Sequence, residues 1–416
     1  MKARTVVVIG GGPAGMMAAG RAAELGCRVM LLEKGPKLGR KLRISGKGRC
    51  NITNTADVSA FIEAFAPNGK FLYGVFSRFF RDDLLDLLHR MGVPTKTERG
   101  GRVFPESNRA SDVADAVERW VVGCGATEKL NVGARSIEVN GGRVCGVSVY
   151  GGRIAADAVV VATGGASYPK TGSTGDGYAM ARELGHTIVP PEPALSALTA
   201  REEWVRKLQG LSLRNVRATV LCRVDGDEWQ PSGSEFGEML FTHFGLSGPI
   251  ILTLSRRVRS LLKKGEVAIA VDLKPALTRE RLHARLIRDF VQTKHLANYL
   301  PSLAPRLVAD AMVDLTGIPP DRPVNTVTAG ERRLLVELLK DFRVTIAGLR
   351  PLEEAIVTAG GVCTKEIDPK TMASRLVDGL FFAGEVIDVD AETGGFNLQA
   401  AFSTGYVAGE SAASVP

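Results

Sequence analysis

TVVVIGGGPAGMMAAGRAAELGCRVMLLE, residues 5–33, is the stretch of this 416-residue chain that decides its fold. Val6–Ile9 is an apolar, β-branched run without a polar interruption, as expected of a strand buried on both faces of a parallel sheet. A glycine-rich turn and an Ala-rich stretch follow, and Gly26 is placed to end the predicted helix. Cys27–Leu32 predicts a second buried strand. The whole stretch therefore predicts a βαβ unit of a parallel sheet.

The turn between the first strand and the helix has the spacing of a dinucleotide-binding loop, Gly-x-Gly-x-x-Gly. Gly10 permits the tight turn, Gly12 lets the backbone approach a pyrophosphate, and Gly15 lets the helix pack closely on the strand. The free N–H groups at the helix start suit phosphate oxygens. The candidate cofactor-binding residues of this loop are Gly10, Gly12, Pro13, Ala14 and Gly15.

An acidic residue, Glu33, ends the second predicted strand, 18 residues after Gly15, and Lys34 follows it. At this place a carboxylate can accept both hydrogen bonds of an adenosine ribose, and it would repel a 2′-phosphate. A glycine-rich turn alone could be purely structural. With strand, helix and acidic residue in register, the sequence favours binding of an adenine dinucleotide, with Glu33 and Lys34 as candidate contacts.

The far end of the chain favours FAD over NAD. Residues 379–385, GLFFAGE, read as a strand ending in a glycine and an acid, a pattern by which many FAD proteins contact the ribityl and pyrophosphate groups. Residues 394–399, GGFNLQ, open a last helix whose N–H groups suit the N1–C2=O edge of a reduced flavin. The candidate cofactor contacts here, and after the buried run 158–162, are Thr163, Gly164, Gly384, Glu385, Gly394, Gly395, Phe396, Asn397 and Leu398.

Residues 37–54, KLGRKLRISGKGRCNITN, carry six cations within 13 residues and no acid. Glycines interleave with the charges, which favours a loop that approaches a planar or anionic ligand. The alternative is an exposed charged loop. The candidate contacts to flavin or substrate in this segment are Arg40, Lys41, Ser45, Gly46, Arg49, Cys50 and Asn51.

Two residues are candidates for catalysis. Cys50 follows Arg49 and lies near Lys47, so we expect a lowered thiol pKa and a role as proton donor. A small buried packing residue is the alternative. His243 lies in residues 242–245, THFG, and could relay a proton or bind substrate. The alternative is a structural histidine beside a turn.

The composition is that of a globular protein, with 45% hydrophobic and 24% charged residues and a net charge of +8. Residues 1–110 hold 19 basic against 9 acidic side chains, which suits a phosphate-rich ligand or merely a solvated surface. The sequence has no apolar run long enough for a membrane span, and its six scattered cysteines predict reduced thiols and a cytoplasmic protein.

The pattern of elements predicts an interrupted domain. Short strands with turns at Asn140–Gly142 and Gly151–Gly152 precede the proline-rich residues 190–193, which we interpret as the exit from the first domain. Strands and helices follow, and around 355–357 the chain is expected to return to the first sheet. We therefore expect an N-terminal part of a cofactor domain, an insert and a C-terminal part, at residues 1–193, 194–355 and 356–416.

Several motifs together resemble the bacterial BaiN/RdsA family of NAD(P)/FAD-dependent oxidoreductases. Besides the first glycine turn they are SGKGRCNITN (45–54), GRVFPESNRASDV (101–113), ATGG (162–165), FTHFGLSGP (241–249) and FAGEVIDVDAETGGFNLQAA (382–401). Ala391 and Phe396 depart from the family pattern, in which Gly and Tyr are expected. The resemblance implies an α/β fold, a discontinuous Rossmann-like FAD-binding domain with an inserted β-barrel plus helical domain.

The resemblance also implies a reaction, the reduction of a conjugated carbon–carbon double bond. We expect FAD to relay a hydride from NADPH or NADH to one carbon, while Cys50 or His243 protonates the other. The favoured substrate is uridine in large-subunit ribosomal RNA, reduced to dihydrouridine. The alternatives are a small-molecule enone or steroid, an amine substrate of a flavoprotein oxidase, and a flavin-bound assembly factor. Asp388, Asp390 and Glu392 lack the other ligands of a calcium loop and are expected to form a polar loop beside the flavin.

Overall fold

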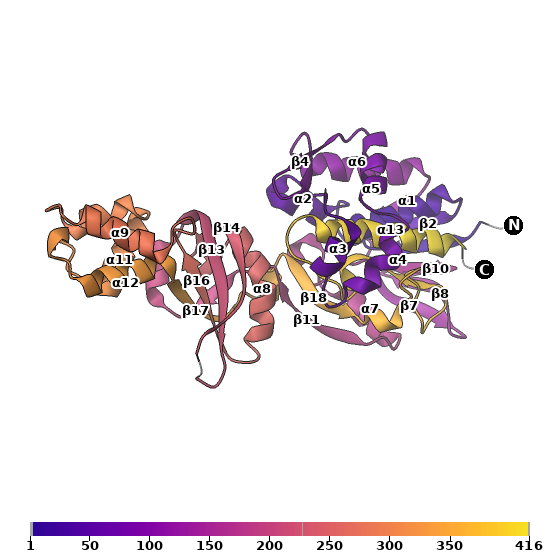
Figure 1. Cartoon of the computed structure of the whole chain (residues 1–416). Coiled ribbons are helices and arrows are strands. Elements are labelled where there is room, and N and C mark those ends of the chain that lie inside the picture. The colour runs from indigo at the N-terminus through magenta and orange to yellow at the C-terminus, as the bar shows by residue number, and fades with distance from the viewer. Residues whose placement is uncertain (1–2, 227, 415–416) are drawn as a thin grey trace. The chain divides into compact units, whose positions relative to one another are not determined.

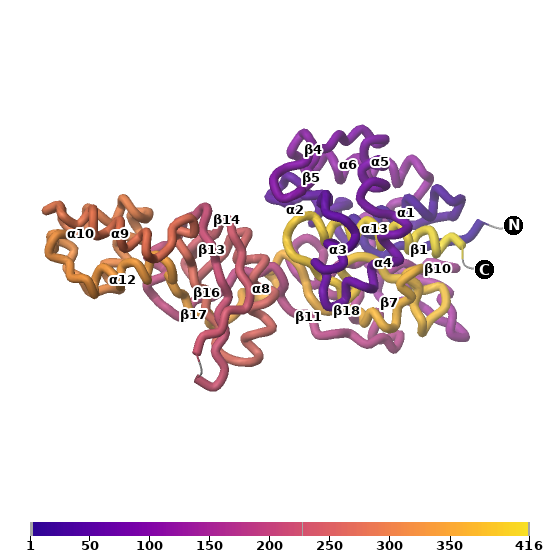
Figure 2. The backbone as a smooth tube through the Cα atoms, in the orientation of Figure 1, coloured from indigo at the N-terminus to yellow at the C-terminus, as the bar shows by residue number. Residues whose placement is uncertain are grey.

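The computed structural model describes residues 3–226 and 228–414 (Figure 1). Two compact units divide the chain. Unit 1 combines Met1–Ala194 with Leu352–Pro416, and unit 2 is Leu195–Pro351. Segments from both ends of the chain, coloured indigo and yellow, lie together in unit 1 (Figure 2). The expected discontinuous α/β domain with an inserted barrel and helices is confirmed.

A five-stranded parallel sheet in the order β19-β10-β1-β2-β6 forms the centre of unit 1. All residues of β1, β10 and β19 are buried, which explains why these strands are continuous apolar runs. The predicted βαβ unit is confirmed, because β1 and β2, which precede and follow helix α1 (Pro13–Glu24) in the sequence, pair in parallel. The strands are β1 (Thr5–Ile9), β2 (Arg28–Glu33), β6 (Thr127–Leu130), β10 (Ala158–Val161) and β19 (Leu380–Phe382).

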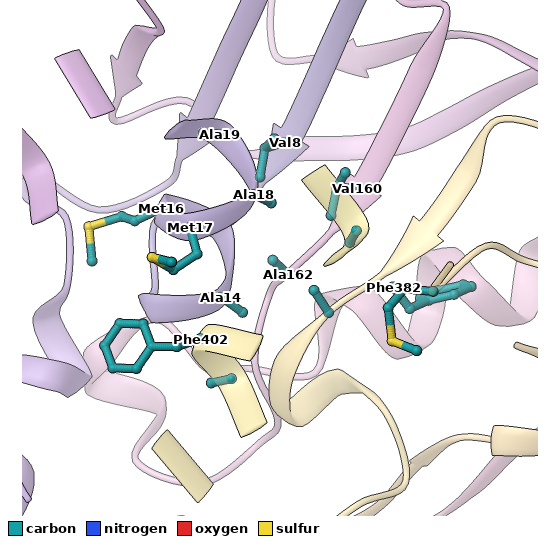
Figure 3. Close-up of a cluster of buried hydrophobic side chains, with 14 of the residues drawn as sticks. Val8, Ala14, Met16, Met17, Ala18, Ala19, Val160, Ala162, Phe382 and Phe402 are labelled. Atoms are coloured by element: carbon teal, nitrogen blue, oxygen red, sulfur yellow. The ribbon is translucent and has the colours of Figure 1, made fainter. Parts of the chain in front are cut away.

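Helix α1 packs along the last helix, α13 (Phe396–Ser414), with the two backbones in close contact. A Cβ added at Gly405 would lie 2.2 Å from Ala14 O, and one added at Gly409 would lie 2.3 Å from Ala18 O. Only glycine therefore fits at either position. Figure 3 shows buried side chains of the core of this unit, among them Ala14 and Ala18 of α1 and Phe402 of α13.

Further helices and three small sheets complete unit 1. The hairpin turns expected at residues 140–142 and 151–152 are confirmed, since they connect β7 to β8 and β8 to β9. The helices are α2 (Arg40–Gly48), α3 (Val58–Ala64), α4 (Tyr73–Phe76), α5 (Arg81–Arg90), α6 (Ala110–Gly123) and α7 (Asp176–Glu183). The strands are β3 (Thr53–Asn54), β4 (Thr95–Glu98), β5 (Arg102–Pro105), β7 (Ala134–Asn140), β8 (Arg143–Val149) and β9 (Gly152–Ala155).

The expectation that residues 355–357 rejoin the first sheet is wrong. They lead into β18 (Val357–Val362), which pairs antiparallel with β11 (Ile188–Ala194) in a separate two-stranded sheet. The proline-rich exit is itself the strand β11, and its prolines lack the N–H donors that a central strand needs. A register shift between Val189 and Glu192 and the left-handed backbone of Gly360 accommodate the prolines.

Unit 2 consists of a closed six-stranded antiparallel barrel and a group of helices (Figure 1). The strand order is β12-β15-β14-β13-β16-β17, and the barrel interior joins the helices in one hydrophobic core. The strands are β12 (Leu198–Ala200), β13 (Ser212–Arg223), β14 (Gln230–Phe241), β15 (Gly245–Ser247), β16 (Glu266–Asp272) and β17 (Phe342–Leu349).

Two helices of unit 2, α9 and α12, begin at a capping threonine. Thr328 accepts from Glu331 N and Glu331 accepts from Thr328 N, a capping box at the start of α12. The helices are α8 (Pro249–Leu261), α9 (Arg279–Asp289), α10 (Leu296–Tyr299), α11 (Arg306–Thr316) and α12 (Ala329–Lys340). Within the described part of the chain, every helix is too short or too polar to cross a membrane.

Replacing Gly409 by Ala should destabilise unit 1, because the new Cβ would overlap Ala18 O and force the helices apart. Overpacking of this kind costs about 1–3 kcal/mol of the free energy of unfolding. The matched control is Gly123→Ala in α6, where an added Cβ meets nothing within 4 Å. Urea denaturation followed by circular dichroism compares the two. Equal stability of both variants would show that the helices do not need this close contact.

Candidate active site

The loop between β1 and α1 has the geometry of a phosphate cradle. Gly10 has a φ of +106°, and a Cβ there would lie 2.4 Å from Ala162 O. A Cβ on Gly15 would lie 1.8 Å from Gly10 O, so this glycine allows α1 to pack against the loop. At Gly12, by contrast, an added Cβ meets nothing within 4 Å. The open space at Gly12 adjoins the free N–H groups of a helix start, which fits a pyrophosphate.

Glu33 is held at the carboxyl end of β2 by two backbone donors. Its Oε2 accepts from Gly11 N at 2.8 Å and its Oε1 accepts from Gly35 N at 2.7 Å. Each carboxylate oxygen keeps a further lone pair, so the side chain could still accept from ribose hydroxyls. The neighbouring Lys34 pairs instead with Asp176, at 2.5 Å. Glu33 is thus oriented toward the phosphate loop before any ligand binds.

Gly384 and Glu385 follow the strand β19 and lie beside the phosphate loop. Gly384 has a φ of +76°, its N–H donates to Thr404 Oγ1 at 2.9 Å, and a Cβ there would lie 2.8 Å from Ala14 Cβ. The C-terminal segment therefore contacts the first turn of α1. Loops that follow β1, β2, β10 and β19 all meet at the carboxyl edge of the parallel sheet, where α/β folds bind ligands.

A polar cluster surrounds the Glu385 carboxylate. Lys41 Nζ of α2 lies 3.0 Å from Glu385 Oε2, and Ser167 Oγ and Thr358 N donate to Oε1 at 3.1 and 2.9 Å. Lys41 Nζ also donates to Ser167 Oγ, at 2.7 Å. Hydrogen bonds to the charged groups therefore join four segments that are far apart in the sequence. Of these residues, sequence reasoning missed Ser167, although it follows the ATGG motif, and Thr358, for which no motif gave a signal.

The start of α13 lies against β3. Gly394 and Gly395 have φ values of +137° and +100°, and a Cβ on Gly395 would lie 2.3 Å from Thr53 O. Asn54 Nδ2 donates to Gly394 O at 3.0 Å, which fastens this turn from the other side. The Asn397 side chain bonds both the N–H and the C=O of Ala391, at 2.9 Å each. The acidic loop and the helix start are thereby held as one piece.

Three buried side-chain oxygens, two in residues 51–53 and one on α13, have no hydrogen-bond partner among the described residues. They are Asn51 Oδ1, Thr53 Oγ1 and Gln399 Oε1. An unpaired buried oxygen costs about 1–3 kcal/mol, so a polar ligand or water that reaches these atoms would be stabilising. Phe396 is buried and packs edge-on against Phe61, with 4.6 Å between the ring centres, and Leu398 is half-buried on the same first turn of α13.

The cations of residues 37–54 are for the most part used within the protein. Arg43 pairs with Asp115 and Glu118, and Arg49 pairs with Glu98 and bonds Asn108. Arg40 donates to the carbonyl oxygen of Lys170. A kink at Ser45, Gly46 and Lys47 interrupts α2, with the last two in the left-handed region. The segment is therefore a folded, largely neutralised element rather than a free basic loop.

Cys50 does not have the environment that its neighbours suggested. Its side chain is fully buried in the core of unit 1, and burial raises the thiol pKa to about 12, although Ser45 partly opposes the shift. The expectation of a lowered pKa is wrong, because the charge of Arg49 is spent on Glu98 and desolvation penalises a thiolate. A fully buried neutral thiol also cannot reach a ligand, which favours the packing alternative.

Thr163, Gly164 and His243 are the remaining predicted site residues. Thr163 and Gly164 follow β10 at the sheet edge, and a Cβ on Gly164 would lie 3.0 Å from Ser173 Oγ. His243 belongs to unit 2, where its exposed ring packs edge-on against Phe244 at 4.9 Å, and its catalytic role stays a prediction. Among the residues that the structure describes, no group of three or more His, Cys, Asp or Glu could hold a metal ion.

The fold and the glycine cradle define the class of protein: a flavin-dependent oxidoreductase built on a Rossmann fold. The model of the family described as HI0933-like protein Rossmann domain matches residues 4–411, so the chain belongs to that family. This agrees with the resemblance that the motifs carry.

Curated relatives match along the whole chain. A 3-dehydro-bile acid delta(4,6)-reductase from Clostridium scindens is 31% identical, covering 98% of this chain and 99% of the relative. A ribosomal RNA dihydrouridine synthase from Escherichia coli is 30% identical, covering 96% of both chains. The structure of an open flavocytochrome c3 fumarate reductase has a TM-score of 0.54 at 20% identity, covering 99% of this chain and 78% of the other, a likeness of fold alone.

Replacing Gly12 by Val should weaken FAD binding and leave folding intact. The Gly12 backbone is extended, with φ −78° and ψ −177°, so valine fits it, but its side chain would fill the open cradle. Hydrogen bonds to charged groups contribute about 1.5–3 kcal/mol each, so affinity should fall at least about tenfold. Flavin fluorescence quenching measures the affinity, and thermal unfolding of the apoprotein checks the fold. A variant that retains native affinity would place the pyrophosphate elsewhere.

Cys50 should resist alkylation in the folded protein. A raised folded-state pKa means that burial of the neutral thiol stabilises the protein fully below the unfolded thiol pKa of about 9. That contribution is lost as the pH rises through about 12. Iodoacetamide at pH 8, followed by peptide mass spectrometry, should label the half-buried Cys145, Cys222 and Cys363 first. Early labelling of Cys50 in native protein would restore it as a reactive thiol.

Proposed function

We propose that the protein reduces uridine to dihydrouridine in large-subunit ribosomal RNA, with NADPH or NADH as the reductant. The observation that carries the proposal is the relative named ribosomal RNA dihydrouridine synthase, which matches 96% of this chain at 30% identity. The C5=C6 bond of uracil is conjugated to a carbonyl, the bond type that a flavin reductase acts on. The basic excess of residues 1–110 agrees with a phosphate-rich substrate.

The residues of unit 1 would hold FAD along the carboxyl edge of the parallel sheet. The open backbone at Gly12 and the N–H groups of α1 would bind the pyrophosphate, and Glu33 the adenosine ribose. Glu385 and Lys41 would flank the middle of the cofactor, and the start of α13 at Gly395 would face the ring. When bound, FAD supplies hydride transfer between the nicotinamide and the substrate carbon.

The chain itself would contribute orientation and a proton. The N-terminal dipole of α13 stabilises negative charge near its first turn. The Asn397 bonds to Ala391 and the Asn54 bond to Gly394 hold that turn in place. The burial of Cys50 argues against its role as proton donor, so His243 is the remaining candidate from the sequence.

A small-molecule enone is the second candidate substrate. It is favoured by the bile-acid reductase relative, which is 31% identical over 98% of this chain. A bile acid is an apolar steroid with a single carboxylate, whereas RNA is a polyanion that needs several cations to bind its phosphates. The binding of the two candidate substrates should therefore differ in its dependence on salt concentration and on the cations near the proposed FAD site.

Deleting the gene and mapping dihydrouridine in the large ribosomal RNA tests the proposal. We expect one modified site to disappear and to return with the wild-type gene, but not with the gene encoding Gly12→Val. Persistence of every dihydrouridine site in the deletion strain would refute the RNA substrate. Steady-state oxidation of NADPH by purified enzyme with a conjugated steroid enone would then test the second candidate.

A further inference from the structure

The hairpin formed by β4 and β5 carries a group of cations beside the proposed cofactor edge. Its turn contains Gly100 and Gly101, with φ values of +77° and +70°. Lys96 is half-buried on β4, and Arg99 and Arg102 are exposed at the turn and on β5. Arg49 reaches the same hairpin from α2, because it pairs with Glu98. These four cations, Arg49, Lys96, Arg99 and Arg102, are called the basic rim below.

The charge of the basic rim is only partly neutralised. The pKa of Glu98 is lowered, mainly by the hydrogen bond from Arg49 and to a smaller extent by the charges of Lys96 and Arg102. Lys96 and Arg102 are therefore close enough to Glu98 to act on its charge. Among the residues that the structure describes, Lys96, Arg99 and Arg102 form no ion pair. With Glu98 taken by Arg49, the other three charges stay available to an anion outside the protein.

Two guanidinium groups of the rim are held by an aromatic ring. Arg49 Cζ lies 4.2 Å from the centre of the Phe104 ring, and Arg102 Cζ lies 5.8 Å from it. Phe104 is itself buried, so its position is determined by the core. Cation–π contact orders long side chains that would otherwise be mobile, which lowers the entropy that a ligand must overcome.

A direct hydrogen-bonded link joins the rim to the start of α13. Asn54 Nδ2 donates to both Gly100 O, at 3.1 Å, and Gly394 O, at 3.0 Å. The next residue, Thr55, donates its N–H to Gly101 O at 2.8 Å. Asn54 therefore fastens the hairpin turn to the glycine turn of α13, and Thr55 adds a second bond to the hairpin. The hairpin that carries the rim therefore lies one hydrogen-bonded side chain away from the α13 turn.

We infer that the basic rim binds the phosphate backbone of the RNA next to the target uridine. This inference rests on the proposed function and names the surface that the RNA would use. Guanidinium groups match phosphate oxygens with paired N–H donors, and an RNA backbone presents several phosphates to the three cations, whereas a bile acid has a single carboxylate for them. The position of the rim beside the cofactor edge suits a backbone contact that sets which base reaches the site.

The test compares two triple variants of the full-length holoenzyme. One removes the rim charges, with Lys96→Ala, Arg99→Ala and Arg102→Ala. The matched control removes three exposed cations elsewhere in unit 1, with Arg119→Ala, Lys129→Ala and Arg135→Ala. The probe is an unmodified transcript of the large-subunit ribosomal RNA. Affinity is measured between about 50 and 200 mM salt, and flavin reduction by NADPH and by NADH is measured without RNA.

The rim variant should lose at least about tenfold in RNA affinity. The slope of log affinity against log salt concentration should become less steep by about 2, because each of the three lost phosphate contacts contributes about 0.7 on single strands. Its flavin content and both reduction rates should match the control. Equal affinity and slope in the two variants would overturn the inference. A raised KM for NADPH but not for NADH would also overturn it, since the rim would then bind a 2′-phosphate.

A separate measurement, dihydrouridine formation by the wild-type enzyme, tests the proposed function. Dihydrouridine formed on the transcript by the wild-type enzyme is quantified by mass spectrometry. If the wild type binds the transcript but forms no dihydrouridine, the proposed function fails, while the affinity comparison still decides whether the rim binds RNA. If the wild type forms dihydrouridine and the rim variant does so equally at every RNA concentration, the inference about the rim fails and the function stands.

Discussion

The close backbone contact between α1 and α13 is the constraint on which the rest of unit 1 depends. Gly405 and Gly409 bring α13 within reach of Ala14 O and Ala18 O, distances that no side chain could tolerate. Each helix begins at a glycine turn, one at the phosphate loop and one at residues 394–395. Because the helices are rigid and touch along their length, the two turns are held in a set relation, although nearly the whole chain separates them in sequence.

The polar contacts of the site follow from this arrangement. The segment after β19 contacts Ala14 through Gly384 and presents Glu385 to Lys41, and β3 supports the turn of α13 through Asn54. Of the six cations of residues 37–54, Lys37 and Arg43 meet acids of α6, Arg49 meets Glu98 of β4 and Lys41 meets Glu385. The neighbouring hairpin carries three cations that form no ion pair among the described residues, and this is why the rim rather than the segment itself is the surface assigned to RNA.

The parts of this architecture that were predictable from sequence are those set by local sterics and periodicity. The glycine turn at residues 10–15 and the apolar strands could be predicted, because backbone conformation and strand burial leave a direct pattern in the residues. Cys50 was mistaken for a reactive thiol, since neither its burial nor the pairing of Arg49 with Glu98 is visible in the neighbouring residues. Thr358, which donates to Glu385, gave no signal because its role exists only after distant segments meet.

The central claim is that both ends of the chain bind one FAD molecule, and the crystal structure of the protein with FAD tests it most directly. We expect the pyrophosphate at the open backbone of Gly12 and the isoalloxazine ring at the start of α13, beside Gly395 and Asn397. An FAD that contacts the N-terminal loop while its ring lies away from α13 would contradict the account.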